Sequence, residues 1–188
     1  ASLSLRLAEH QMNRKFTAEF ANVSIPALPL GRSGNIVHGN ACRVDWNVVC
    51  PHTKEEEVFV MGNPPYLGSR NQEPEHKVDV ETIFSRFKSY KDLDYVACWF
   101  MKGAYYINNT FAKVAFVSTN SITQGEQVAP LWGKLMVEYN VHIDFAHRTF
   151  RWDNEASLKA HVHCVIIGFS CYETDKSRQL YSNAGKMQ

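Results

Sequence analysis

The sequence lacks several features that would place it in familiar classes of protein. Its five cysteines are scattered and include no Cys-x-x-Cys pair, which argues against a zinc ribbon or a disulfide framework and favours a reducing cytoplasm. No apolar run approaches the length of a membrane span, and the N-terminus has no signal-peptide core. Lys and Arg total 20 against 19 acidic residues, so there is no broad positive field. Any affinity for nucleic acid must therefore be local or be supplied by another part of the protein.

A glycine-rich nucleotide loop and a metal-binding cluster are also missing. Gly31 and Gly34 follow a proline-containing turn instead of a strand, so residues 31–34 are interpreted as an ordinary loop. His161 and His163 would share one face of a strand, but without an acidic partner nearby we predict no metal site.

The chain is long enough to bury one sizeable core. Its 188 residues are 45% hydrophobic and 12% aromatic, with no low-complexity stretch. We expect one compact domain over residues 1–188, in which the polar tail 173–188 frays.

The most informative motif is Asn63-Pro64-Pro65-Tyr66, which follows the apolar run 58–62. The two prolines remove two backbone donors and fix two φ angles, so the carbonyls of Asn63 and Pro64 are held as acceptors. The Asn63 side-chain oxygen is a further acceptor, and the Tyr66 ring can stack on a heterocycle. This combination suits methyl transfer to an exocyclic amine. An ordinary Pro-Pro turn at a strand end is the structural alternative.

The spacing of apolar residues predicts an α/β fold. Strands are expected at residues 36–38, 58–61, 113–117, 141–146 and 161–169. Helices are expected at residues 5–20, 80–87, 94–107 and 127–139. The alternation implies a mainly parallel sheet with helices on both faces. No crossover helix separates the last two strands, so we expect them to pair antiparallel at one edge, joined by a long loop that contains Phe150.

Ligands of such sheets bind at the carboxyl ends of the strands. Four residues are expected just after strand ends and should line one crevice: Asn40, Asn63, Asn120 and Phe150.

Several motifs, taken in order, resemble those of the S-adenosylmethionine-dependent DNA adenine-N6 methyltransferases. They occupy residues 37–41, 62–66, 115–120, 145–152 and 160–169. The chain is most similar to the large methylase subunits of fused restriction–modification enzymes, over about residues 5 to 170. The resemblance implies a Rossmann-like methyltransferase fold, S-adenosyl-L-methionine as cofactor and DNA as partner. Target-recognition and endonuclease domains could belong to the same chain.

The chain also departs from this family. Complete members resemble a nucleotide-binding fold with a glycine-rich first loop and an acidic residue ending the second strand, and neither is found here. Residues 2–20 resemble the helix that follows that strand. The resemblance therefore implies an N-terminally truncated methyltransferase core, which we expect to be inactive by itself.

The resemblance and the residue chemistry together assign the site. Asn63 and Pro64 would accept hydrogen bonds from the target amine, with Pro65 fixing the turn. Tyr66 and Phe150 would sandwich a flipped adenine. By resemblance, Asn40 and Ala41 would contact the cofactor adenine. Candidates for contacts with the DNA backbone are Arg70, Arg148 and Arg151.

Two other functions remain open. A protein glutamine-N5 methyltransferase uses a similar acceptor motif, but a glutamine needs no second stacking ring, so Phe150 favours a nucleobase. A non-catalytic methyltransferase-like scaffold could keep the fold without the cofactor loop.

Overall fold

The computed structural model describes residues 2–20, 35–152, 162–174, 177–182 and 185–187. Its helices are α1 (Ser2–Glu19), α2 (Trp46–Val49), α3 (Pro74–Phe84), α4 (Ala97–Ile107) and α5 (Val128–Tyr139), with short 3-10 turns at Ser69–Asn71, Asn120–Thr123 and Gly125–Gln127. Its strands are β1 (Phe59–Gly62), β2 (Lys113–Thr119), β3 (His142–Trp152), β4 (Val162–Ser170), β5 (Gln179–Ser182) and β6 (Gly185–Met187). The expected α/β fold is confirmed.

The strands form one sheet in the order β1-β2-β4-β3-β5-β6. The pairs β1–β2 and β3–β5 are parallel, while β2–β4, β3–β4 and β5–β6 are antiparallel. Four strands (β1, β2, β3 and β5) therefore run in one direction, and β4 and β6 run against them. The carboxyl ends of the four parallel strands meet at one end of the sheet, where the predicted site should lie.

The structure corrects three details of the prediction. The antiparallel strand β4 lies between β2 and β3, inside the sheet. The tail does not simply fray, because Gln179–Ser182 pairs with the open edge of β3 and Gly185–Met187 pairs in turn with β5. Residues 36–38 form no strand, since none of the described segments offers them a ladder.

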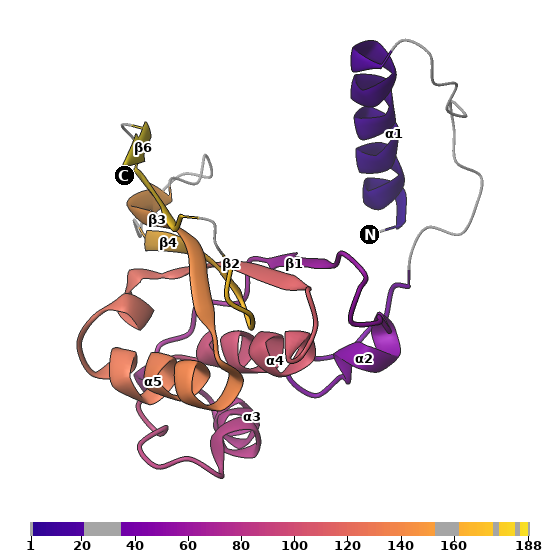
Figure 1. Cartoon of the computed structure of the whole chain (residues 1–188). Helices are drawn as coiled ribbons and strands as arrows, with labels where there is room; N and C mark the ends of the chain where they lie inside the picture. Colours follow the sequence, from indigo (N-terminus) through magenta and orange to yellow (C-terminus); the bar gives the residue numbers. More distant parts are fainter. Residues whose placement is uncertain (1, 21–34, 153–161, 175–176, 183–184, 188) are drawn as a thin grey trace, which may run out of the picture.

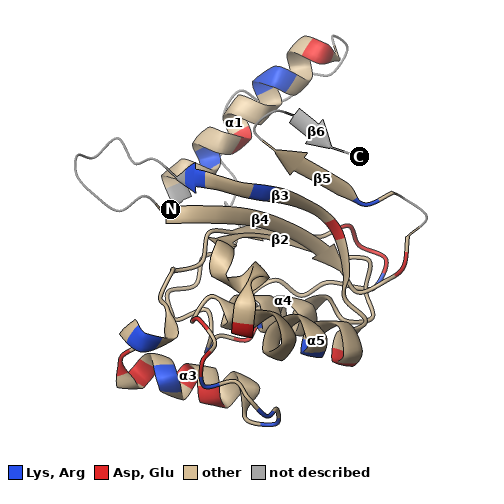
Figure 2. Cartoon of the chain, turned by 90° about the vertical axis from the view of Figure 1, so that its left-hand side faces the viewer, with Lys and Arg blue, Asp and Glu red and all other residues tan. Residues whose placement is uncertain are grey.

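The core lies between the sheet and the helices α4 and α5, which cover one face, and extends to α3, which packs against α4 on the side away from the sheet (Figure 1). Phe100 of α4 is fully buried at its centre. Its ring lies 5.4 Å from Phe116 of β2, 5.5 Å from Trp132 of α5 and 5.9 Å from Phe169 of β4. Four elements are thus joined by aromatic contacts. Helix α1 lies on the opposite side of the sheet and stands apart from it (Figures 1 and 2).

Local sequence explains where one of these helices begins and where another ends. Helix α3 starts at Pro74, behind a capping box in which the Glu73 and His76 side chains each accept from the other residue's backbone. Helix α5 ends at Asn140, which adopts the left-handed conformation with φ 51°.

Gly168 of β4 leaves space for an aromatic ring on the face of the sheet away from the core. A Cβ atom at Gly168 would lie 2.0 Å from the Phe145 ring. We therefore predict that Gly168→Ala destabilises the fold by about 1–3 kcal/mol through overpacking, measured by urea denaturation. Gly133→Ala is the control, because a Cβ there meets nothing within 4 Å. In a helix this change should stabilise. Equal effects at both positions would contradict the prediction.

Candidate active site

The Asn63-Pro64-Pro65-Tyr66 motif begins directly after β1, as the sequence predicts. Pro64 is buried, Asn63 and Pro65 are exposed, and Tyr66 is half-buried. Because β1 and β2 are parallel, the motif lies at the same end of the sheet as the carboxyl end of β2. The acceptors of the motif are therefore displayed at the end of the sheet where ligands of such folds bind.

Tyr66 is held by two neighbours. Its hydroxyl donates a hydrogen bond to Asn63 Oδ1, and Cys164 is a neighbour of the same phenol that affects its pKa. Burial raises the pKa of Tyr66 above its ordinary value, and the neighbouring Cys164 raises it further. The phenol is therefore protonated at neutral pH and able to donate.

Cys164 connects Tyr66 with Phe150. In the ladder, Cys164 of β4 lies opposite Thr119 at the end of β2 and opposite Phe150 of β3. Residues paired in this way place their side chains on one face of the sheet. Tyr66 and Phe150, which are distant in sequence, thus share a fully buried neighbour.

Phe150 lies within strand β3, so the prediction that it belongs to a loop was wrong. The pairing shifts by one residue between His147 and Phe150, which is a β-bulge. Because side chains alternate along a strand, the extra residue returns Phe150 to the face that His147 occupies. Their rings are 5.2 Å apart in an edge contact. Phe150 is half-buried and stands outside the hydrophobic core.

A buried carboxylate that sequence reasoning missed fixes the loop after the motif. Asp94 is 9% exposed and accepts hydrogen bonds from the backbone of Ser69 at 3.2 Å and the Ser121 hydroxyl at 2.5 Å. The backbone N–H of Tyr95 donates to the Leu67 carbonyl at 2.8 Å. Asp94 thus connects the loop after Tyr66 to the end of β2. The sequence signal was an acidic residue at the start of an apolar helical segment.

Asn40 is part of a second polar network. Its Nδ2 donates to Asp79 Oδ2 at 3.0 Å and to the Tyr95 hydroxyl at 3.1 Å, while its Oδ1 accepts from the Cys42 backbone at 2.8 Å. Both amide hydrogens are therefore used, and one lone pair of Oδ1 remains for an external donor. Ala41 differs, since it lines a groove of about 510 Å³ between residues 35–50 and β1.

Asp79 accepts most of the hydrogen bonds of this second network, and its ionisation makes the stability of the fold depend on pH. Burial raises the pKa of Asp79, but hydrogen bonds from Arg43, Tyr95 and Asn40 outweigh it and lower the pKa below its usual range. The Arg43 Nε–Asp79 Oδ1 distance is 2.6 Å. A lowered folded-state pKa gives stability at neutral pH that is lost as pH falls below about 4, the unfolded value.

We therefore predict that Asp79→Asn lowers the urea midpoint at pH 7 and that its difference from the natural protein narrows below about pH 4. Glu81→Gln, at an exposed position on the same helix, is the matched control and should change little. If the difference in urea midpoint between Asp79→Asn and the natural protein stayed constant from pH 7 to pH 3, the lowered pKa of Asp79 would not be the source of the stability.

The three candidate DNA-backbone residues are all exposed. Arg70 follows the motif in the turn Ser69–Asn71, and Arg148 and Arg151 flank Phe150 on β3. Figure 2 shows basic and acidic residues interspersed along α1 and α3, with basic segments on β3. The positive charge at the site is thus local, as the composition indicates.

Asn120 lies where the sequence places it, directly after β2 in the turn Asn120–Thr123. Asn40, however, follows no strand and lies in the separate network around Asp79. The crevice is therefore formed by Asn63, Tyr66, Phe150 and the end of β2. Asn40 is connected to it indirectly, because Asn40 bonds to Tyr95 and the adjacent Asp94 bonds to Ser121 after β2.

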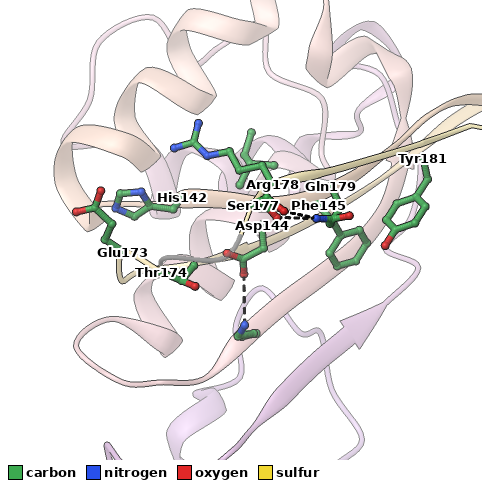
Figure 3. Close-up of a pocket in the computed structure, with 11 residues that line it drawn as sticks. His142, Asp144, Phe145, Glu173, Thr174, Ser177, Arg178, Gln179 and Tyr181 are labelled. Carbon is green, nitrogen blue, oxygen red and sulfur yellow. Dashed lines mark hydrogen bonds and ion pairs between the residues drawn. The ribbon is translucent and has the colours of Figure 1, made fainter. Parts of the chain in front are cut away.

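Other polar clusters lie outside this site. A cavity of about 690 Å³, drawn in Figure 3, lies at the opposite end of the sheet, where β2 and β3 begin, and includes the Lys113–Asp144 ion pair at 3.9 Å. Glu73, Glu75 and His76 lie close together, but Glu73 and His76 already cap α3. His163 is exposed on β4, while His161 and residues 31–34 lie outside the described residues.

The fold and this constellation define an α/β domain with a candidate methyltransferase site at the carboxyl ends of its strands. The MmeI DNA-methyltransferase domain family matches residues 1–182, and the chain belongs to that family. The resemblance found in the sequence is thus confirmed. Among the described residues, no helix has the length and apolar character needed to cross a membrane.

Two relatives show the extent of the similarity. DNA methyltransferase A of Bacillus subtilis (strain 168) is 49% identical over 186 residues, which are 99% of this chain and 21% of the relative. The structure of the Type IIL restriction-modification enzyme MmeI in complex with DNA matches with a TM-score of 0.76 and 44% identity, over 96% of this chain and 24% of that one. The chain therefore spans about a quarter or less of these relatives.

Proposed function

We propose that the chain is the core of an S-adenosylmethionine-dependent DNA methyltransferase that modifies the N6 amine of adenine within a restriction–modification system. One observation supports this proposal above all. Tyr66 and Phe150, which are far apart in the sequence, are both neighbours of Cys164, and the exposed acceptor Asn63 lies beside them. The relatives support DNA as the partner, since one is named a DNA methyltransferase and another was solved in complex with DNA.

The site chemistry supports an amine as acceptor of the methyl group. The lone pair of an exocyclic amine is conjugated into the ring and is a poor nucleophile. Hydrogen bonds from this amine to Asn63 Oδ1 and the Pro64 carbonyl would favour a pyramidal nitrogen and strengthen as it becomes positive. The proline rings restrict the backbone that carries the Pro64 carbonyl, and the Tyr66 hydroxyl holds Asn63 Oδ1 through a hydrogen bond. No covalent intermediate with the protein is needed.

S-adenosyl-L-methionine supplies an activated methyl group when bound. The apolar groove that Ala41 lines beside β1 is the candidate site for the adenine ring. Asn40 precedes Ala41 in the chain, and one lone pair of its Oδ1 remains for an external donor. The other residues of Asn40's network hold that oxygen in place. We infer that Asn40 and Ala41 serve the cofactor adenine.

The target base must leave the duplex to reach this site. Tyr66 and Phe150 offer aromatic surfaces for stacking, and exposed Arg70, Arg148 and Arg151 offer charges for nearby phosphates. Sequence recognition and cleavage would require further parts of the protein. The half-buried ring of Phe150 at this end of the sheet favours a nucleobase over a protein glutamine.

The test is methylation by the full-length protein with radiolabelled S-adenosylmethionine and plasmid DNA, followed by nucleoside analysis. N6-methyladenine is the expected product. Label in another base, or in a protein glutamine when bacterial extract is the substrate, would overturn the proposal. The absence of any transfer, with cofactor and DNA both present, would favour a non-catalytic scaffold.

A further inference from the structure

Three hydrogen-bond donors from separate parts of the chain meet on the buried Asp94 carboxylate. Its Oδ1 accepts from the backbone N–H of Ser69 at 3.2 Å and from Gln127 Nε2 at 3.3 Å. Its Oδ2 accepts from the Ser121 hydroxyl at 2.5 Å. Ser69 belongs to the loop after the motif, Ser121 to the turn after β2, and Gln127 to the turn before α5. Asp94 is thus a junction at which three segments are fixed to one another.

Residues 93–95 hold the loop that follows the motif at three points. The bonds run from Gln72 Nε2 to the Leu93 carbonyl at 2.8 Å, from Ser69 N–H to Asp94 Oδ1 at 3.2 Å, and from Tyr95 N–H to the Leu67 carbonyl at 2.8 Å. The described pairing of β1 ends at Gly62, before the motif begins. The position of Tyr66 therefore depends on the loop that residues 93–95 bind.

Two hydroxyl groups join the end of β2 to the same carboxylate. Thr119, the last residue of β2, places its Oγ1 2.8 Å from Ser121 Oγ. A serine hydroxyl carries one hydrogen, and Ser121 donates it to the Asp94 carboxylate, which can only accept. Thr119 must therefore donate to Ser121. The bonds run in one direction, from Thr119 through Ser121 to Asp94.

The end of β2 lies between the two sides of the crevice. In the sheet, β2 separates β1, which leads into the motif, from β4 and β3. Thr119 lies opposite Cys164, and Cys164 lies opposite Phe150, so Thr119 and Phe150 share one face of the sheet. The distance from Tyr66 to Phe150 therefore depends on how the motif loop is fixed to the end of β2.

We propose that Asp94 is a positioning residue for methyl transfer, which holds the motif loop against the carboxyl end of β2 and so places Asn63 and Tyr66 relative to Phe150. This inference rests on the proposed function. A misplacement of about 1 Å can cost about 100-fold in rate, so kcat should respond to this junction. Because Asp94 acts through hydrogen bonds, an uncharged side chain that keeps them should serve almost as well.

The experiment measures kcat and the KM for S-adenosylmethionine in the full-length protein. Asp94→Ala should lower kcat by about 10- to 100-fold, because the loop is released from β2. The KM for the cofactor should stay within about 3-fold, since neither Asp94 nor the residues that bond to its side chain line the groove beside β1. Asp94→Asn should keep kcat within about 3-fold of the natural value, because its oxygen can accept from Ser69 and Ser121 can turn to accept from its NH2 group.

Asp144→Ala is the matched control. Asp144 is a largely buried carboxylate that accepts from the Ser170 hydroxyl at 3.0 Å, at the opposite end of the sheet. Its loss should leave kcat unchanged even if stability falls. Equal losses of kcat for Asp94→Ala and Asp144→Ala, full activity of Asp94→Ala, or an Asp94→Asn variant as slow as Asp94→Ala would each overturn the proposal.

Ser121→Ala tests the link to β2 alone and keeps the test decisive if Asp94→Ala does not fold. It should lower kcat by about 3- to 10-fold, because it removes one hydrogen bond of the junction. Adding Asp94→Ala to Ser121→Ala should cost less than Asp94→Ala does alone, since the link is already broken. Ser170→Ala, which removes the corresponding bond at Asp144, should have no effect. Full activity of Ser121→Ala, or effects that multiply, would count against the proposal.

A readout without catalysis separates this inference from the proposed function. Amide hydrogen exchange of the full-length protein, followed by mass spectrometry, reports how firmly the loop is held. Asp94→Ala should speed exchange in peptides that cover residues 67–72 and 120–123, and Asp144→Ala should not. Unchanged exchange in these peptides would overturn the junction. Faster exchange in Asp94→Ala, with no N6-methyladenine formed by the natural protein, would count against the proposed function alone.

Discussion

Replacing Asn63 with alanine should reduce methyl transfer by the intact protein by about 100-fold or more while changing cofactor affinity by no more than a few-fold. The proposed hydrogen bonds to the target amine are weak while the nitrogen is neutral and strengthen as it becomes positive, so their loss raises the barrier. The structure supports this role because Asn63 is exposed at the end of β1, with its oxygen already oriented by Tyr66. Removal of one such preorganised group typically costs two to three orders of magnitude, about 10²–10³ in kcat.

The measurement is single-turnover methylation at saturating DNA, beside a cofactor titration. Asn71→Ala is a matched control, because Asn71 is an exposed asparagine in the turn Ser69–Asn71 just beyond the motif. It should retain full activity. If Asn63→Ala lost cofactor binding and turnover to the same degree, the motif would be a structural element of the cofactor site.

The helices and strands that pack around Phe100 could largely be predicted from the sequence. The segments 94–107, 113–117 and 127–139 match α4, β2 and α5 closely, because each has a clear apolar period and a local end signal. Packing against the sheet then agrees with the local preference. The expected start of α3 was too late, since the polar first turn of that helix depends on Pro74 and the capping box.

Pairing between distant segments could not be predicted in the same way. The tail strand Gln179–Ser182 is short and polar in part, and it becomes a strand because β3 leaves an edge for it. The extension of β3 through Phe150 depends on a bulge that no local pattern announces. Residues 36–38 are the opposite case. They are largely apolar, but no described segment pairs with them, and they form no strand.

For the candidate site, the sequence indicated the groups that would meet a ligand but missed the groups that hold them. Asn63 and Tyr66 stand in a rare local motif, so chemistry alone identified them. Asp79 and Asp94 act through hydrogen bonds to residues that are remote in sequence, and Cys164 lies opposite the remote residue Phe150 in the sheet. Nothing in their local sequence distinguishes them from ordinary polar or core residues.

Loss of the aromatic rings of Tyr66 and Phe150 should strongly weaken binding of the target base, an effect second only to that of Asn63→Ala on methyl transfer. Tyr66→Ala and Phe150→Ala are each expected to weaken target engagement by about 1–3 kcal/mol, the usual value for stacking on one base. The double variant should approach the sum if the rings contact opposite faces of the base. The measurement is the affinity for a DNA duplex with 2-aminopurine at the target position, whose fluorescence rises on extrusion.

A mismatched target base provides the sharpest comparison. Extrusion of such a base costs less, so the variants should lose less affinity for mismatched than for paired DNA. Tyr105→Ala and Phe111→Ala are matched controls, because both rings are exposed at sites away from β3 and the motif. They should bind both duplexes as the natural protein does. If Phe150→Ala methylates DNA as well as the natural protein, Phe150 has no part in base binding. The proposal that the substrate is a nucleobase would then lose its main structural support. Methyl transfer to a protein glutamine needs only the acceptors of the Asn-Pro-Pro-Tyr motif, and it would become the better explanation of the site.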